Sequence, residues 1–209
     1  MTQTHYYGPS YCTPARMASF GYQIQEVCKT GPERVLEIGI GNGIVTSVLR
    51  RNVKKVVTLD IDPQLDPDIC GSILRLPFGN NSFDSILCCE VLEHLPFDSL
   101  ESALSELRRV SRRHVVISLP DVTRYYVIRF LLPRLSLYKR ISFPYGSPRP
   151  PVTGGEHFWE IGRVHYQLKV IEDAIKKSSF HIEYTYRVPE LEYHRFFILS
   201  KRDCAVHTP

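Results

Sequence analysis

One stretch near the N-terminus, Arg34-Val-Leu-Glu-Ile-Gly-Ile-Gly-Asn-Gly43, constrains the fold of this chain more than any other. Its first half is apolar enough for a buried strand, and its second half has glycines at alternate positions, Gly39, Gly41 and Gly43. The next eight residues, Ile44–Arg51, predict a helix. A strand, a glycine turn and a helix form the first half of a nucleotide-binding βαβ unit, because a Cβ at the glycine positions would block the turn or the approach to a ligand.

Two acids near this turn indicate which ligand it binds. Glu37 lies two residues before the first glycine, and Asp60 ends the next predicted strand. A carboxylate at the second place can hold both hydroxyls of a ribose. The spacing Glu-x-Gly-x-Gly-x-Gly differs from the Gly-x-Gly-x-x-Gly of dinucleotide-binding folds. It resembles the first motif of the class I S-adenosylmethionine-dependent methyltransferases.

Two later segments resemble motifs of the same methyltransferases. Leu76-Pro-Phe-Gly-Asn-Asn-Ser-Phe-Asp84 matches the segment before the fourth strand, and Glu90-Val-Leu-Glu-His94 matches the residues that lead from that strand into a helix. The resemblance extends over residues 34–120. It implies an α/β protein with the three-layer Rossmann-like methyltransferase fold, in which a mostly parallel seven-stranded sheet has an antiparallel last strand.

The other elements are predicted from local patterns of caps, breakers and apolar residues. In chain order they are a helix from Thr13-Pro14 to Gly31-Pro32, strands at Val56–Asp60, Gly71–Leu74 and Ser85–Cys89, a helix at Leu100–Val110, a strand at His114–Leu119, a helix at Leu168–Ser178, and strands at His181–Arg187 and Arg195–Ser200. We therefore expect a single domain over residues 1–209. Residues 1–30 hold an N-terminal cap helix, expected either to lie over the cofactor or to pack on the sheet.

The composition is that of a soluble domain, with 43% hydrophobic and 23% charged residues. The first twenty residues lack the basic start and apolar run of a signal peptide, and no uncharged stretch is long enough to cross a bilayer, so we expect a cytoplasmic protein. The six cysteines have no Cys-x-x-Cys spacing. Their arrangement favours a reducing compartment and argues against a zinc site, and no metal ligand is expected.

The net charge of +4 is unevenly distributed. Residues 108–149 contain ten Lys/Arg, Arg129, Arg134 and Arg140 among them, and a single acid, Asp121. This basic segment could bind an anionic acceptor, rest on an anionic membrane, bind RNA, or be a solvated basic face of a substrate lid. Nucleic acid is the least favoured partner, because the chain carries no RNA-binding module.

The resemblance implies S-adenosylmethionine as the cofactor, which becomes S-adenosylhomocysteine after transfer. The residues that it implies at the cofactor are Glu37, Gly39, Ile40, Gly41, Gly43, Asp60, Ile61, Ser72, Ile73 and Glu90. Ser72 departs from the family pattern, because relatives carry an acid there that binds the adenine amino group. A hydroxyl accepts that hydrogen bond more weakly, and main-chain groups near Ile73 can substitute for it.

Two histidines are candidates for the proton transfer that methylation of a hydroxyl requires. His157 lies between glycines and aromatic residues within the variable segment 121–163, which we expect to form a lid over the acceptor site. A histidine can act as a base near neutral pH, although His157 can equally serve to order its loop. His94 is a second candidate, with packing as its alternative role.

The function predicted from these features is methyl transfer to the oxygen of a small-molecule or glycan-like acceptor. Transfer to nitrogen is an alternative, although the chain lacks the Asn/Asp-Pro-Pro-Tyr/Phe motif of adenine and glutamine amide methylation after the fourth strand. A catalytically silent methyltransferase-like subunit is an alternative from another class. The sequence does not indicate the acceptor or the oligomeric state.

Overall fold

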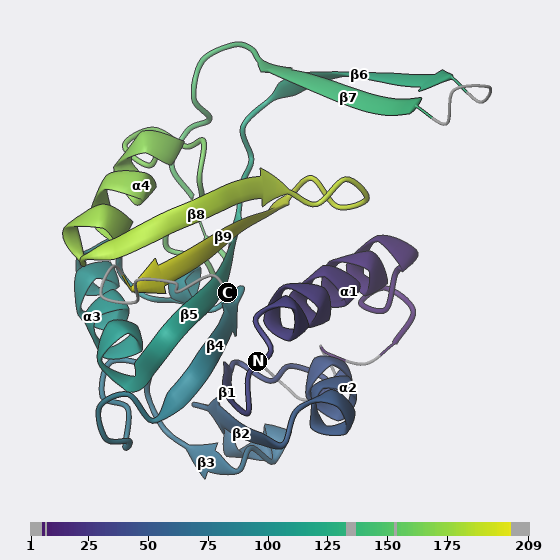
Figure 1. Ribbon diagram of the computed structural model, residues 1–209. Coiled ribbons are helices and arrows are strands. Elements are labelled where there is room, and N and C mark those ends of the chain that lie inside the picture. Colours follow the sequence, from purple (N-terminus) through teal and green to yellow (C-terminus); the bar gives the residue numbers. More distant parts are fainter. Residues whose placement is uncertain (1–5, 7, 133–136, 153, 202–209) are drawn as a thin grey trace.

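The computed structural model describes residue 6 and residues 8–132, 137–152 and 154–201. One seven-stranded sheet, with strand order β3-β2-β1-β4-β5-β9-β8, forms the middle of the molecule (Figure 1). Its strands are β1 (Arg34–Ile38), β2 (Lys55–Asp60), β3 (Ile69–Cys70), β4 (Phe83–Cys89), β5 (Ser111–Pro120), β8 (Phe180–Arg187) and β9 (His194–Lys201). The helices are α1 (Pro14–Lys29), α2 (Ile44–Asn52), α3 (Leu100–Val110) and α4 (Leu168–Lys177), with short 3-10 turns η2 (Pro63–Leu65), η3 (Leu92–His94) and η4 (Phe97–Ser99).

The pairing of the strands confirms the predicted fold class. Strands β3, β2, β1, β4 and β5 pair in parallel, whereas β9 pairs antiparallel with both β5 and β8. The carboxyl ends of the parallel strands therefore meet at one edge of the sheet, which is where open α/β sheets bind ligands.

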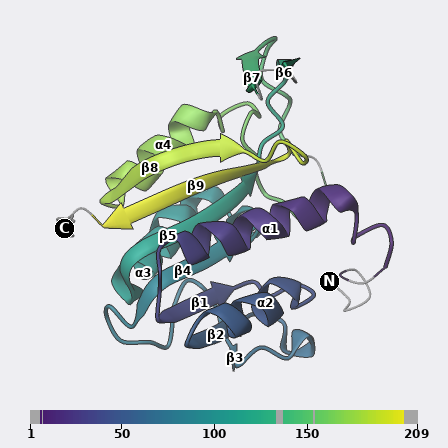
Figure 2. The same cartoon turned by 45° about the vertical axis from the view of Figure 1, so that its right-hand side comes forward.

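Two apolar clusters, one on each face of the sheet, form the core. Helices α1 and α2 cover one face, and α3 and α4 cover the other (Figures 1 and 2). Successive strand residues alternate between the faces: Val35 packs with α1 and α2, and Leu36 packs with α3 and α4. Both residues are completely buried. The three layers follow from this two-sided burial.

Helix α1 begins where its sequence predicts. The Thr13 hydroxyl accepts a hydrogen bond from the Arg16 amide at 3.3 Å, and Pro14 occupies the first turn. The helix crosses the sheet in the second view (Figure 2). Its buried Glu26 accepts hydrogen bonds from the hydroxyls of Tyr184 and Tyr186 on β8, at 2.6 and 2.8 Å. These bonds tie α1 to the far edge of the sheet.

The predicted strand at Gly71–Leu74 is wrong, because the third strand ends earlier, at Cys70. The Gly71 amide donates to the Asp60 carbonyl at 2.8 Å and is followed by a turn in which the Arg75 amide bonds to the carbonyl of Ser72. The Ser72 hydroxyl also accepts from the Leu74 amide. Such local side-chain bonds compete with a strand ladder, and here they bend the chain instead of extending it.

A second sheet, which the sequence did not predict, is a hairpin of β6 (Tyr125–Leu132) and β7 (Leu137–Pro144). It projects from the body of the molecule beyond β8 and α4 (Figure 1). The backbones of Arg129 and Arg140 are register partners in it, and Arg134 lies outside the described residues. The basic segment therefore extends from α3 through β5 to this hairpin.

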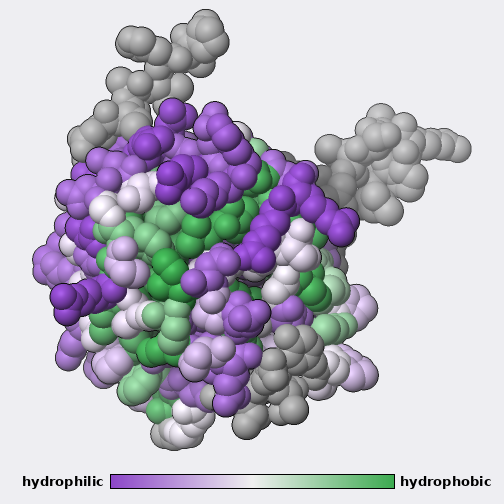
Figure 3. Space-filling model, turned by 90° about the horizontal axis from the view of Figure 1, so that it is seen from below, coloured by the Kyte–Doolittle hydropathy of each residue, from purple (hydrophilic) through white to green (hydrophobic). Residues whose placement is uncertain are grey.

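Exposed apolar side chains concentrate on the hairpin. A different face of the molecule, seen from below, also has hydrophobic residues near its middle, with hydrophilic residues around them (Figure 3). The large apolar side chains described as exposed are Ile61, Leu74, Tyr126, Ile128, Phe143, Tyr145, Phe158 and Tyr184. Half of them belong to the hairpin or adjoin it. Among the described helices, none has the length and hydropathy that a membrane span needs.

Candidate active site

A cavity of about 410 Å³ opens at the carboxyl ends of β1, β2 and β4. Its walls come from the loops after these strands, from α1, and from the segments around His157 and His194. Every residue predicted for the site except Gly43 lines it. Gly43 instead precedes α2 with a left-handed φ of 72°, which glycine adopts readily.

The glycine turn brings two loops into contact. Gly39 has a φ of 80°, and a Cβ there would lie 2.3 Å from the Val91 side chain in the loop after β4. Its amide donates to the Leu59 carbonyl at 2.9 Å. Gly39 is therefore required for the close approach of the first and fourth strand ends, in addition to leaving space for a ligand.

Asp60 holds the glycine turn through its side chain. One carboxylate oxygen accepts from the Ile40 amide at 2.9 Å, and the other accepts from the Asp62 amide at 3.0 Å. A carboxylate can accept about four hydrogen bonds, so both oxygens keep capacity for ligand hydroxyls. Beside it Ile61 is 74% exposed and lines the cavity, where it offers an apolar surface to a flat ring.

Glu37 is a buried acid at the base of the turn. It accepts a hydrogen bond from the Thr46 hydroxyl of α2 at 2.7 Å. Burial nevertheless raises the pKa of this carboxyl to about 7, against the opposing effects of Thr46 and Arg50. Glu37 lies at the point where the cavity meets the first strand and can be ionised or neutral near physiological pH.

Glu90 begins the opposite wall of the cavity in a strained conformation. Its φ of 53° is left-handed, which is uncommon for a residue other than glycine. The Ser118 hydroxyl donates to one carboxylate oxygen at 2.8 Å, and His194 lies 3.6 Å from the other. Burial raises the pKa of Glu90 to about 7, although Ser118 and Arg16 favour the charged form. Strain of this kind concentrates at functional sites.

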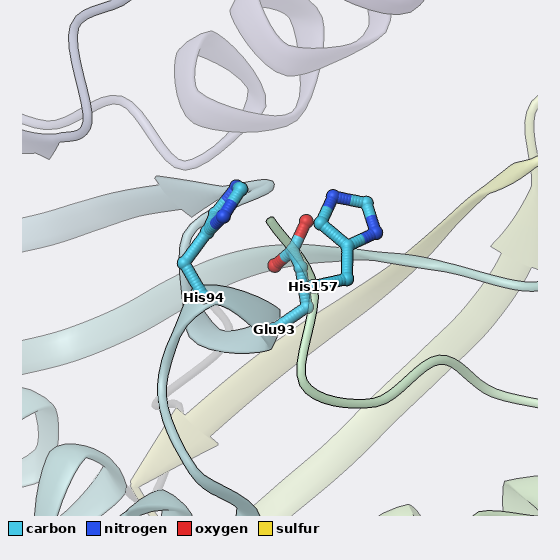
Figure 4. Close-up of side chains that lie close together, drawn as sticks. All are labelled: Glu93, His94 and His157. Atoms are coloured by element: carbon cyan, nitrogen blue, oxygen red, sulfur yellow. The ribbon is translucent and has the colours of Figure 1, made fainter. Parts of the chain in front are cut away.

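His94 and His157 line the same wall, and the buried Glu93 lies close to both of them (Figure 4). The histidine rings stand edge to face with centroids 4.9 Å apart. Burial lowers the pKa of His94. Burial and the Glu90 charge raise the pKa of Glu93 well above its usual range. The fold thus joins the two predicted bases, and it adds an acid that the sequence did not single out.

His157 is held from one side by Glu160. Its Nδ1 lies 3.1 Å from a Glu160 carboxylate oxygen, and the Tyr193 hydroxyl donates to the same oxygen at 2.6 Å. Arg163 bonds to the other oxygen of Glu160 at 2.7 Å. Burial opposes ionisation of Glu160, but these hydrogen bonds outweigh it and lower its pKa. Glu160 therefore orients the His157 ring as a carboxylate.

Several lining residues come from parts of the chain that no motif marks. They are Tyr6, Tyr11, Arg16 and Gln23 at the N-terminal side, and Tyr193 and His194 at the start of β9. Arg16 stacks over the Tyr11 ring at 4.2 Å, and Ser19 joins His194 at 2.8 Å across 175 residues of sequence. The only sequence features that could have indicated these residues are the tyrosine-rich start and the capped helix. Helix α1 both packs on the sheet and lines the cavity.

Parts of this chain are similar to known proteins. A family model described as "Methyltransferase domain" matches residues 36–119. An uncharacterised protein of Methanocaldococcus jannaschii is 36% identical over 83 residues, and the match covers 36% of this chain and 35% of that protein. A second uncharacterised protein of the same organism is 27% identical over 174 residues, with 78% and 67% covered. The chain therefore spans about a third of the first relative and two thirds of the second.

Solved structures show the same fold at low sequence identity. The 1,6-didemethyltoxoflavin-N1-methyltransferase of Burkholderia thailandensis, with S-adenosylhomocysteine bound, superposes with a TM-score of 0.63 at 15% identity over 89% of this chain and 79% of its own. The N-methyltransferase NodS of Bradyrhizobium japonicum, in complex with S-adenosylhomocysteine, gives 0.64 at 12% identity over 92% and 90%. The motifs and the family model over residues 36–119 agree with the sheet, and the chain has the Rossmann-like fold of the class I S-adenosylmethionine-dependent methyltransferases.

Proposed function

We propose that this chain transfers a methyl group from S-adenosylmethionine to a hydroxyl oxygen of a small-molecule or glycan-like acceptor. The observation that carries the proposal is that two sets of residues line one and the same cavity. Asp60, the glycine turn and Glu37 line one side, and His94 and His157 line the other. The first set suits the cofactor, and the second suits an acceptor that must lose a proton.

The cofactor side has the donors, acceptors and space that S-adenosylmethionine needs. Asp60 would accept from the ribose hydroxyls, Ile61 and Ile73 would contact the adenine ring, and Ser72 would bond to its amino group. The backbone at Gly41 would lie against the methionine part, beneath Tyr6 and Tyr11, whose side chains lie 3.5–3.8 Å from the place of a Cβ. Glu37 would balance the charge of the amino group. The bound S-adenosylhomocysteine of the two similar methyltransferases supports this assignment.

When bound, S-adenosylmethionine supplies a methyl group on a positive sulfur that keeps the electron pair of the broken S–C bond while the acceptor oxygen forms the new bond and loses its proton. The chain must then hold the acceptor oxygen in line and accept or release that proton. Nδ1 of His157 lies 3.1 Å from the Glu160 carboxylate, and Nδ1 of His94 donates to the Glu156 carbonyl at 3.0 Å. The Nε2 atoms are therefore the groups left to act on an acceptor.

The charge of the cavity bears on the acceptor. None of the ten Lys/Arg of residues 108–149 is among the described lining residues. Arg109 and Arg112 of that segment pair with Glu106 and Asp84 instead. We therefore propose a neutral hydroxyl acceptor in the cavity. The hairpin is left as the place for contact with an anionic membrane.

Thermal unfolding with two cofactors tests the proposal. S-adenosylhomocysteine should raise the melting temperature and a nicotinamide dinucleotide should not, because a ligand that binds only the native state stabilises it. Labelled S-adenosylmethionine should then transfer its methyl group to hydroxyl compounds in an acceptor panel, detected by mass spectrometry. Transfer to amines alone would make the chain an N-methyltransferase. A shift with the dinucleotide and none with S-adenosylhomocysteine would overturn the proposal.

A further inference from the structure

The acceptor side of the cavity holds a potential set of metal ligands. One ligand atom each from Glu93, His94 and His157 lie within 4.8 Å of one another. Figure 4 shows the Glu93 carboxylate between the two imidazole rings. Glu93 and His94 lie on η3 after β4, whereas His157 comes from the loop before α4, so the fold assembles the set from distant parts of the chain.

Two hydrogen bonds fasten the loop of His157 to the segment of Glu93. The Phe158 amide donates to the Glu93 carbonyl at 2.8 Å, and the Trp159 indole donates to the Leu95 carbonyl at 3.0 Å. Trp159 is completely buried in the core. Rigid support of this kind is what a preorganised binding site needs.

The histidines are oriented as metal-binding histidines usually are. Nδ1 of His94 donates to the Glu156 carbonyl at 3.0 Å, and Nδ1 of His157 faces the Glu160 carboxylate at 3.1 Å. A partner on one ring nitrogen fixes the tautomer and leaves a lone pair on the other. Histidines that ligate metals almost always donate their second nitrogen to a carbonyl or a carboxylate in this way.

Glu93 supplies an independent observation. Its side chain is completely buried, and within the described chain neither carboxylate oxygen has a donor at ordinary hydrogen-bond geometry. The neighbouring Glu90 carboxyl interacts with Glu93 and favours its neutral form. Burial disfavours the charged form of a carboxylate that has no cation beside it. Glu90, which is half-buried, lines the cavity nearby, and Glu160 is already paired with Arg163. A cation beside Glu93 would give its carboxylate the partner that it lacks.

We propose that Glu93, His94 and His157 bind a divalent first-row transition metal ion that also contacts the acceptor hydroxyl. Two imidazoles and one carboxylate suit Mn²⁺, Fe²⁺, Co²⁺, Ni²⁺ or Zn²⁺ better than Mg²⁺ or Ca²⁺, which prefer oxygen ligands. Metal–ligand bonds of 2.0–2.2 Å hold tetrahedral ligand atoms about 3.4 Å apart. Side-chain rotations that move each ligand atom by about an ångström would therefore close the site.

The inference rests on the proposed function, because it assigns the ion a part in methyl transfer. Three protein ligands leave coordination positions for water and the acceptor. The ion polarises the acceptor hydroxyl, whose proton goes to water while the oxygen forms its bond to the methyl group. One hydroxyl and one S-adenosylmethionine thus become a methyl ether, S-adenosylhomocysteine and a proton. His157 then acts as a ligand and not as the base.

Calorimetric titration of chelator-treated protein with MnCl₂ tests the site directly. We expect one saturable Mn²⁺ per chain. Loss of a residue that only supports a metal ligand typically weakens metal affinity about 10–100-fold. Loss of a ligand itself should cost at least as much, so His157→Ala and the isosteric Glu93→Gln should each weaken Mn²⁺ binding by at least about tenfold. His181→Ala is the matched control, because His181 is exposed and lies at the start of β8, at the opposite edge of the sheet. No saturable binding, or binding unchanged in both site variants, would overturn the inference.

A measurement on the unmodified protein keeps the test independent of how the variants fold. Bound Mn²⁺ should broaden the ring proton signals of His94 and His157 in NMR spectra and leave those of His181 sharp. Equal broadening of all three would contradict the site. S-adenosylhomocysteine stabilisation is measured alongside: stabilisation without Mn²⁺ binding overturns only the metal inference. Mn²⁺ binding without that stabilisation leaves the metal site standing and overturns the proposed function.

Discussion

Asp60 has two tasks, and substitution separates them. Asp60→Ala should weaken S-adenosylhomocysteine binding by about 1.5–3 kcal/mol for each charged hydrogen bond lost to the ribose. It should also lower the free energy of unfolding by about 1 kcal/mol per bond, because the Ile40 and Asp62 amides lose their acceptor. Calorimetry and urea unfolding measure the two effects. Asp66→Asn, on the same loop but outside the cavity lining, should change neither. Unchanged affinity in Asp60→Ala would place the ribose elsewhere.

Glu37 should make stability depend on pH in a particular direction. Its folded pKa of about 7 lies above the 4.5 of an unperturbed carboxyl, so between these values the unfolded chain releases a proton that the folded chain keeps. Stability should fall as pH rises through this window, by roughly 3 kcal/mol in total. Glu37→Gln should lack this decline, so its stability relative to the unmodified protein should be higher at pH 8 than at pH 5. Urea unfolding at both pH values checks this, with exposed Glu33→Gln as control. An equal difference at both would show that Glu37 titrates normally.

At the scale of elements, the hairpin β6–β7 carries the clearest prediction. Tyr126 and Phe143 are register partners, 63% and 51% exposed, and Tyr126 stacks on Tyr145 at 4.2 Å. Exposed aromatic residues within a basic segment favour binding to an anionic bilayer. The protein should therefore cosediment with phosphatidylserine-rich vesicles and not with phosphatidylcholine vesicles. Added salt should weaken binding, and the double change Tyr126→Ser and Phe143→Ser should reduce it severalfold. Equal recovery with both vesicle types would reduce the segment to a solvated basic face.

The elements that local sequence predicted are those with their own start and stop signals. Thr13-Pro14 sets the beginning of α1, and the apolar spacing of Leu100–Val110 gives the whole of α3. The hairpin was missed because Tyr125–Leu132 is an apolar run broken only by Arg129, which does not distinguish a strand from a buried helix. The third strand was misplaced because the turn at Ser72 depends on bonds to its own backbone, which a propensity does not show.

At the scale of the whole molecule, the two sides of the cavity differ in how far sequence could predict them. The cofactor side lies within contiguous motifs around the glycine turn and Asp60, so a resemblance could assign it. The acceptor side joins η3 to the loop at His157 and to Tyr193, which follow η3 in the chain by about 60 and 100 residues. No local pattern encodes that contact, and the spacing of cysteines carries no information about a cluster that contains only glutamate and histidine.

Hydrogen exchange can test whether the two sides respond separately. S-adenosylhomocysteine should slow amide exchange in the loops after β1 and β2 and in the first turn of α1, because these segments line the cofactor side. Exchange in the loop of His157 should change little, because Phe158 and Trp159 already fasten it to η3. The hairpin, which projects away from the cavity, serves as the internal control (Figure 1). Equal slowing in the His157 loop and on the cofactor side would show that S-adenosylhomocysteine contacts both sides of the cavity. The assignment of one side to the cofactor and the other to the acceptor would then be wrong.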